Sequence, residues 1–169
     1  MMLRPLILAA LPLAAAGCAT DMSTAPAAPI PVERQAITYS TQPCFGTCPV
    51  YRVSVTPEGQ GVFIGERHTA ATGEHRFQVT SEVARRFADH LASVRPASGD
   101  RRIDMQSEDC GIAPTDMPGI AVEWASNTGA APQTLSLYLG CRSVEAQRVA
   151  GVLRAAPDML PIADFIGKR

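Results

Sequence analysis

Aromatic residues and long hydrophobic runs are scarce in this sequence. Phe, Trp and Tyr account for 5% of the 169 residues, with a single Trp. The longest apolar run, Leu6 to Ala16, spans 11 residues and contains a proline, whereas a membrane-crossing helix needs about 20 apolar residues. An excess of one charge is also lacking, because the formal net charge is −1, and nucleic-acid-binding domains normally carry a basic stripe. We therefore expect neither a transmembrane helix in this run nor a nucleic-acid partner.

The motifs of several enzyme classes are missing as well. There is no Gly-x-Ser-x-Gly elbow of the kind that carries the nucleophile of α/β-hydrolases. The glycines Gly59, Gly61 and Gly65 belong to a predicted hairpin rather than to a phosphate-binding loop. The charged segment from Asp100 to Asp109 lacks the ligand spacing of a calcium site. We therefore expect no catalytic activity and no cofactor.

The N-terminus is typical of a bacterial export signal. Arg4 and the N-terminal amine precede the apolar run, which ends in Ala14-Ala15-Ala16-Gly17 and is followed by Cys18. A short positive segment, an apolar stretch and small residues are the parts of a signal peptide. The final residues resemble the lipobox of bacterial lipoproteins, in which small residues precede an obligatory cysteine, although Ala15 stands where that motif usually has leucine.

The lipobox resemblance implies that Cys18 becomes the first residue of the mature protein and carries lipid on its thiol and its amine. Several acyl chains anchor a protein stably, since each buried CH₂ contributes about 0.8 kcal/mol. The alternative is an ordinary secretory signal, which leaves Cys18 as a free thiol. By resemblance to enteric sorting rules, Ala19 favours the outer membrane over the inner one. We expect a protein on the periplasmic side of the cell envelope, attached to the membrane through its N-terminal lipid.

The composition divides the chain into three parts. Residues 1–17 form the signal peptide, residues 18–33 comprise the lipidated Cys18 and an Ala/Pro-rich tether, and residues 34–169 form a single α+β domain. Proline-rich segments favour extended conformations of about 3.1 Å per residue, so the tether can hold the domain up to about 40 Å from the lipid.

Alternating apolar and polar residues predict six strands. Four of them, at residues 36–40, 51–56, 61–65 and 75–79, follow one another closely and indicate an antiparallel meander. Two more, at 120–124 and 135–139, are predicted to form a hairpin. Residues 95–118 are polar and lack a period, which predicts a long loop that needs a tie or a function.

Two helices complete the predicted domain. Thr80 or Ser81 caps a helix whose apolar stripe is Val83, Phe87, Leu91 and Val94. Ser143 caps the second helix, whose predicted buried side is Val144, Val149, Val152 and Leu153, and the tail is expected to dock through Leu160, Ile162, Phe165 and Ile166. The predicted fold is α+β: an antiparallel β-meander of about four strands, a helix, a β-hairpin and a helix, with the helices packed on one face of the sheet.

Four cysteines remain if Cys18 carries lipid. An even number of cysteines in an exported domain indicates disulfides, and four cysteines allow three pairings. We favour Cys44–Cys48, because Gly46 lets the short loop fold back. We also favour Cys110–Cys141, because that bridge would tie the long loop to the end of the last strand.

A family resemblance appears at Cys44 to Tyr51. This stretch, CFGTCPVY, resembles the Cys-Phe-Gly-x-Cys-Pro-x-Tyr hallmark of the bacterial family known as domain of unknown function 6438. In that family a hairpin follows, with a Gly in its turn and an aromatic residue shortly before another Gly, as at Gly59, Phe63 and Gly65. A Thr-Asp-x-Pro segment of the family is similar to Thr115 to Pro118. The resemblance covers about residues 37–153, and it implies no catalytic residues, because the family has no assigned activity.

Two functions stay open. The leading prediction is a non-catalytic domain that binds an envelope protein or has a structural role in the envelope, through an edge strand or through residues 95–118. The alternative is copper handling or thiol redox chemistry at Cys44 and Cys48, because thiolates suit Cu(I). His75 would then supply a third ligand, with His68 and His90 as the other candidates. Redox motifs usually have two residues between the cysteines at a helix N-terminus, whereas here there are three, leading into a strand.

Overall fold

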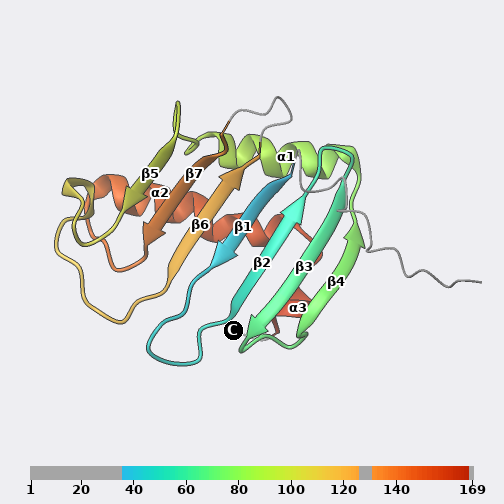
Figure 1. Ribbon diagram of the computed structural model, residues 1–169, viewed down its shortest axis with the longest axis horizontal. Coiled ribbons are helices and arrows are strands. Elements are labelled where there is room, and N and C mark those ends of the chain that lie inside the picture. Colours follow the sequence, from blue (N-terminus) through green and yellow to red (C-terminus); the bar gives the residue numbers. More distant parts are fainter. Residues whose placement is uncertain (1–35, 126–130, 168–169) are drawn as a thin grey trace, which may run out of the picture.

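The computed structural model describes residues 36–125 and 131–167 (Figure 1). In chain order the elements are β1 (Ile37–Thr41), β2 (Val50–Val55), β3 (Gln60–Arg67), β4 (Gly73–Gln78), α1 (Ser81–Ala92), β5 (Asp100–Ile103), the 3-10 helix η2 (Glu108–Cys110), β6 (Gly119–Trp124), β7 (Gln133–Tyr138), α2 (Val144–Ala155), the 3-10 helix η3 (Ala156–Met159) and α3 (Ala163–Ile166). The strands form one sheet with the order β4-β3-β2-β1-β6-β7-β5. β5 is parallel to β7, and the other neighbouring pairs are antiparallel.

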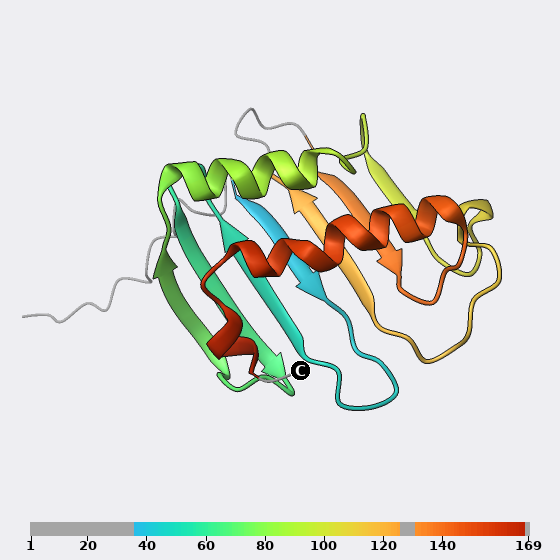
Figure 2. The same cartoon turned by 180° about the vertical axis from the view of Figure 1, so that it is seen from behind.

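One face of the sheet carries the hydrophobic core. On β2, Val53 and Val55 are buried while Arg52 is exposed, which is the alternation of a strand with one buried face. The helices α1 and α2 run across the buried face, and α3 lies near β3 (Figure 2). Their buried side chains, which include Phe87, Leu91, Val149, Leu153 and Ile166, complete the core. The other face carries mainly polar and small side chains and is turned toward the viewer in Figure 1.

The predicted fold was wrong in its sheet. The sequence predicts a meander of about four antiparallel strands and a later hairpin, whereas the structure has one mixed sheet of seven strands. β1 lies in the middle, because Tyr39 pairs with Val53 of β2 on one side and with Val122 of β6 on the other. The first strand thus joins the meander to the hairpin. Alternation along the chain does not reveal this pairing, because the partners are far apart in sequence.

The seventh strand comes from the segment that was predicted to be a loop. Asp100 to Ile103 forms β5, with Ile103 beside Leu137 of β7. Only Ile103 of these four residues is buried, so the segment lacks the apolar alternation that identifies a strand in the sequence. η2 follows and contains the buried Cys110.

Both predicted helices begin at their predicted caps. The hydroxyl of Thr80 accepts a hydrogen bond from the amide of Val83 at 3.2 Å, and the hydroxyl of Ser143 accepts one from Ala146 at 3.0 Å. Val144 was expected on the buried side of α2, but it is 90% exposed. It precedes the buried Ala146 by two residues and therefore lies on the opposite side of a helix with 3.6 residues per turn.

The C-terminal tail docks on the domain, as predicted. Ile162 and Ile166 are buried, and the ring of Phe165 lies 5.4 Å from that of Phe63 on β3. The amide of Ala70 in the β3–β4 turn donates to the carbonyl of Ile166 at 3.1 Å. Among the helices in the described ranges, none has the length and hydropathy needed to cross a membrane.

Candidate functional site

Three loops leave the sheet at the same end. Thr41 at the end of β1 pairs with Ile120 near the start of β6, and Gly119 pairs with Tyr138 at the end of β7. Ile103 at the end of β5 lies beside Leu137. This end of the sheet therefore carries three segments, which we call together the stapled end: residues 42–49, 104–118 and 139–145 (Figure 1). The described chain begins with Ala36 at the opposite end of β1.

The first of two disulfides closes the loop between β1 and β2. Cys44 and Cys48 are bridged, with 5.8 Å between their Cα atoms, in the pairing that the sequence favours. Gly46 has a φ of +152°, a region open to glycine and strained for other residues. The hydroxyl of Thr41 closes the base of the loop, because it donates to the carbonyl of Pro49 at 2.8 Å and accepts from the amide of Tyr51 at 3.0 Å.

The second disulfide ties η2 to the approach of α2. Cys110 and Cys141 are both buried, and their Cα atoms are 4.5 Å apart, again in the favoured pairing. The carbonyl of Cys110 accepts hydrogen bonds from the amides of Arg142 at 2.8 Å and Ser143 at 3.0 Å. The long loop thus has the tie that its length required.

Segment 111–118 is held from both sides. The hydroxyl of Tyr138 donates to the carbonyl of Pro114 at 2.8 Å and accepts from the amide of Met117 at 3.0 Å. The amide of Phe45 donates to the carbonyl of Asp116 at 3.2 Å. This last bond joins the loop of the first disulfide to the loop that follows the second, so the stapled end is one connected surface.

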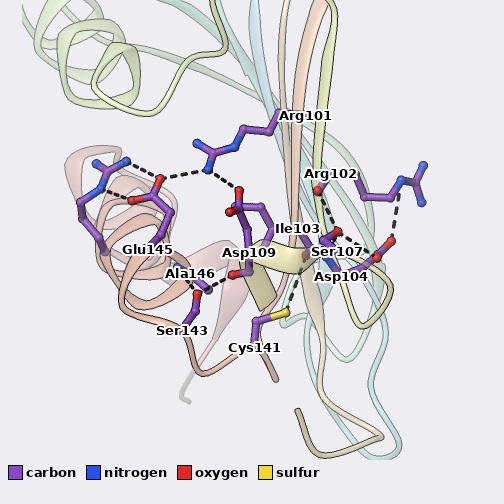
Figure 3. A network of polar contacts seen from close by, with 11 residues as sticks. Arg101, Arg102, Ile103, Asp104, Ser107, Asp109, Cys141, Ser143, Glu145 and Ala146 are labelled. Carbon is purple, nitrogen blue, oxygen red and sulfur yellow. Dashed lines mark hydrogen bonds and ion pairs between the residues drawn. The ribbon is translucent and has the colours of Figure 1, made fainter. Parts of the chain in front are cut away.

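An ion-pair network braces the same end from the helix side (Figure 3). Arg101 of β5 reaches Asp109 of η2 and Glu145 of α2, each at 3.0 Å, and Arg148 pairs with Glu145 at 2.8 Å. The hydrogen bonds from Arg148, together with those from Arg101, lower the pKa of Glu145 from its ordinary 4.5 to about 2. The hydrogen bond to Asp109 raises the pKa of Arg101. Arg101 and Glu145 therefore both stay charged at neutral pH.

Two serines continue this network along the backbone (Figure 3). The hydroxyl of Ser143, which caps α2, also donates to the carbonyl of Asp109. The hydroxyl of Ser107 donates to the carbonyl of Arg102 and accepts from the amide of Asp104, both at 3.0 Å. These contacts hold the turn from β5 into η2, so covalent, ionic and hydrogen bonds together brace the stapled end.

An apolar pocket of about 190 Å³ lies beside the first disulfide. Its lining comes from the ends of β1, β2, β6 and β7 and from the helices, and includes Cys48, Pro49, Pro118, Leu139, Arg154 and Pro157. Tyr51, the last residue of the CFGTCPVY stretch, also lines it and is 4% exposed. Its ring stacks on Phe63 at 5.3 Å, which anchors the base of the loop in the core.

The stapled end also carries exposed apolar side chains. Phe45 is 89% exposed, Ile112 90%, Val144 90% and Met105 58%. In residues 36–125 and 131–167, these four are the large hydrophobic side chains that are exposed. Exposed apolar residues are ordinary when they are scattered, but all four belong to the three segments of one end of the sheet.

The histidines proposed as copper ligands do not join the cysteines. His75 lies on β4, three strands from β1, where it stacks on Phe165 at 5.2 Å. The ring of His90 contacts the carbonyl of Val152 at 2.8 Å and links α1 to α2. His68 lies just after β3. In the part of the chain that the structure describes, no three His, Cys, Asp or Glu side chains are grouped as a metal site requires.

Cys18, the predicted lipidation site, and the predicted tether lie outside the described residues. Sequence reasoning found all four bridged cysteines but missed the network of Arg101, Asp109, Glu145 and Arg148 and the exposure of Val144. Charges in a polar loop are commonly solvated, so they gave no indication of a network. Nothing in the sequence of the polar segment distinguished Ile112, which is exposed, from Ile103, which is buried.

These features define a class of protein: a two-layer domain in which helices cover one face of a mostly antiparallel sheet, the other face is open, and disulfides brace the loops at one end of the sheet. The chain belongs to the family described as Domain of unknown function (DUF6438), whose model matches residues 35–151. The matched range contains both disulfides and all seven strands. No curated protein matches the chain.

Proposed function

We propose that this protein is exported and anchored through lipid on Cys18, on the periplasmic side of the bacterial envelope, with the outer membrane favoured over the inner one. Residues 1–17 act as the signal peptide and residues 18–33 as the lipidated cysteine and tether. Residues 34–169 act as a non-catalytic binding domain or as a structural part of the envelope.

The observation that carries this proposal is the bracing of one end of the sheet by two disulfides. Such bonds persist in oxidising compartments and are rare in the cytosol, and Cys110–Cys141 is buried in the core. Both bridges hold loops rather than the centre of the sheet. Loops positioned by a rigid scaffold are where binding residues are commonly found.

The direction of the chain supports the same proposal. The described chain enters β1 at Ala36, while the stapled end lies beyond Thr41 at the other end of the strand. A lipid attached before the tether would therefore connect to the domain at the end opposite the stapled end and leave the stapled end free for a partner. This arrangement suits a domain that meets a partner within the periplasm.

Labelling cells with an alkyne fatty acid tests the anchor. The wild-type chain should take up label and fractionate with membranes, with no alkylatable thiol before reduction, whereas a Cys18→Ser variant should lose the label. Mass spectrometry of the mature chain should place lipid at Cys18 and bridges at Cys44–Cys48 and Cys110–Cys141. An unlabelled protein in the cytosol with reduced cysteines would refute the proposal.

A further inference from the structure

We propose that the stapled end is the docking surface for a protein partner whose contact surface is apolar and carries lysine or arginine. This inference rests on the proposed function, because it names the surface and the partner of that binding domain. The anchoring residues are Phe45, Ile112 and Val144, and the residues that face the partner's cations are Glu108 and Asp116.

The large apolar side chains that are exposed in the described residues all lie at this end of the sheet. Phe45, Ile112 and Val144 are about nine-tenths exposed, and they come from three segments that are far apart in sequence. Their shared location at one end of the sheet therefore comes from the strand order and not from a local feature of the sequence. Aromatic and aliphatic side chains that project from a surface are typical anchors of protein interfaces.

Disulfides and backbone hydrogen bonds brace this surface. The Cys44–Cys48 bridge flanks Phe45, whose amide is bonded to Asp116 at 3.2 Å. Ile112 follows the bridged Cys110 by two residues, and a Cβ placed on Gly111 would lie 3.2 Å from the amide nitrogen of Ser143, directly before Val144. Ordering loops upon binding costs free energy, and a surface braced beforehand avoids much of that cost.

The charged residues near the anchors differ in whether they have an ion-pair partner. Asp104, Asp109 and Glu145 have arginine partners. Glu108 and Asp116 have no ion pair among the described residues, and they lie four residues before and after Ile112. Arg142, two residues before Val144, also has no ion pair in that part of the chain. The complementary surface would therefore place cations toward Ile112 and Phe45 and an anion toward Val144.

The same charges decide between classes of occupant. An anionic bilayer would repel Glu108 and Asp116, and the chain enters the domain at the opposite end of β1. A second copy would bring four carboxylates, Glu108 and Asp116 from each chain, against two Arg142 side chains, so the interface would keep an excess of negative charge. A separate protein with cations beside an apolar patch satisfies both the apolar side chains and the carboxylates.

The test uses the full chain in phosphatidylcholine nanodiscs and three synthetic peptides of equal length, with empty nanodiscs as the blank. The first peptide consists of Leu and Lys, the second of Leu and Glu, and the third of Ser and Lys, so that the charge and the apolar character are varied separately. Fluorescence anisotropy should show that the Leu/Lys peptide binds about tenfold more tightly than either of the others. Raising the salt concentration should weaken that binding, because the charges are exposed.

Matched variants locate the binding surface. Phe45→Ser and Ile112→Ser should each weaken binding of the Leu/Lys peptide by about fivefold or more, as expected for interface anchors. Ile64→Ser, on the open face of the sheet, should leave it unchanged. Glu108→Lys should weaken binding, whereas Glu58→Lys, in the turn at the opposite end, should not. Thermal unfolding of each variant checks that the fold is kept.

Each contrary result overturns the inference. Equally tight binding of the Leu/Glu and Leu/Lys peptides would show that the carboxylates do not select the partner. Unchanged binding of the Leu/Lys peptide by Phe45→Ser would show that the stapled end is not the docking surface. Self-association lost in Phe45→Ser would assign the surface to a second copy. Binding of the full chain with Cys18→Ser to phosphatidylglycerol vesicles, lost in Phe45→Ser, would assign it to a membrane. The fatty-acid label is measured separately, so loss of the anchor and loss of the docking surface are distinguishable.

Discussion

Removal of the Cys110–Cys141 disulfide should be the most damaging change at the stapled end. The bridge spans 31 positions of sequence. Linking two residues that far apart removes conformational entropy from the unfolded chain, and the chain-entropy relation gives about 3.7 kcal/mol for this loop. The Cys44–Cys48 bridge spans 4 positions, for which the same relation gives about 2 kcal/mol. The double variant Cys110→Ala/Cys141→Ala should therefore lose nearly twice as much stability.

Packing increases this difference. Cys110 and Cys141 are 0% and 1% exposed, so alanines there would leave a small cavity, whereas Cys44 and Cys48 are only partly buried. Alanine is preferred to serine at the buried pair, because a serine hydroxyl there would need a hydrogen-bond partner. For a chain of this length, a loss of about 3.7 kcal/mol corresponds to a melting temperature lower by roughly 7–15 °C.

Urea unfolding of the wild-type chain and of the two double variants measures these losses. Each variant lacks both cysteines of one pair, so neither substitution leaves a former bridge partner with a free thiol that could form a wrong bridge. The reasoning predicts a larger loss for the 110/141 variant with little change in the denaturant slope. A loss for the 44/48 variant equal to or greater than that for the 110/141 variant would refute it.

Three further outcomes are expected. Glu145→Gln should lower the free energy of unfolding by ~1 kcal/mol at pH 7. Because the pKa of Glu145 in the folded protein, about 2, lies below the ordinary 4.5, this loss relative to wild type should be complete above pH 4.5 and fade toward pH 2. A loss that does not change with pH in thermal melts would contradict this prediction. Gly59→Ala should lower the free energy of unfolding by ~2 kcal/mol or more, because Gly59 has a φ of +85° and a Cβ there would lie 2.1 Å from the carbonyl oxygen of Val79. Gly151→Ala, on α2 with open space around it, should instead raise the free energy of unfolding by ~0.5–1 kcal/mol. Equal effects of the two substitutions in urea unfolding would contradict this explanation by backbone conformation and space. Titration of the oxidised chain with Cu(I) should give no stoichiometric complex, because the sulfurs of Cys44 and Cys48 are bridged, and a tight complex lost in Cys48→Ser would restore the copper hypothesis.

Two glycines of the hairpin motif are explained by the space around them. Gly59 and Gly65 belong to the hairpin pattern on which the family resemblance depends. A Cβ on Gly65 would lie 2.0 Å from the carbonyl oxygen of Ala71. Both glycines are thus required by close backbone approach in the β3–β4 region, which explains their presence as a matter of folding and not of chemistry.

The candidate site was predictable in its covalent part. The number and spacing of cysteines indicated both bridges, because a disulfide needs only two cysteines that the chain can bring together. The ionic part was not predictable, because Arg101 and Glu145 are 44 positions apart. Their meeting depends on β5 adding to the edge of the sheet beside β7, and β5 has a single buried residue to indicate it.

Interactions between residues close in the sequence determined most of the strands and the starts of both long helices. Alternation located six of the seven strands, and Thr80 and Ser143 located the helix starts, because side-chain period and capping act within a few residues. Only the tertiary structure decided that β1 lies at the centre of the sheet, that β5 exists and that Val144 faces solvent. These outcomes depend on which distant segments pair and pack, and the free energy of such contacts belongs to the assembled sheet and helices rather than to any one stretch of chain.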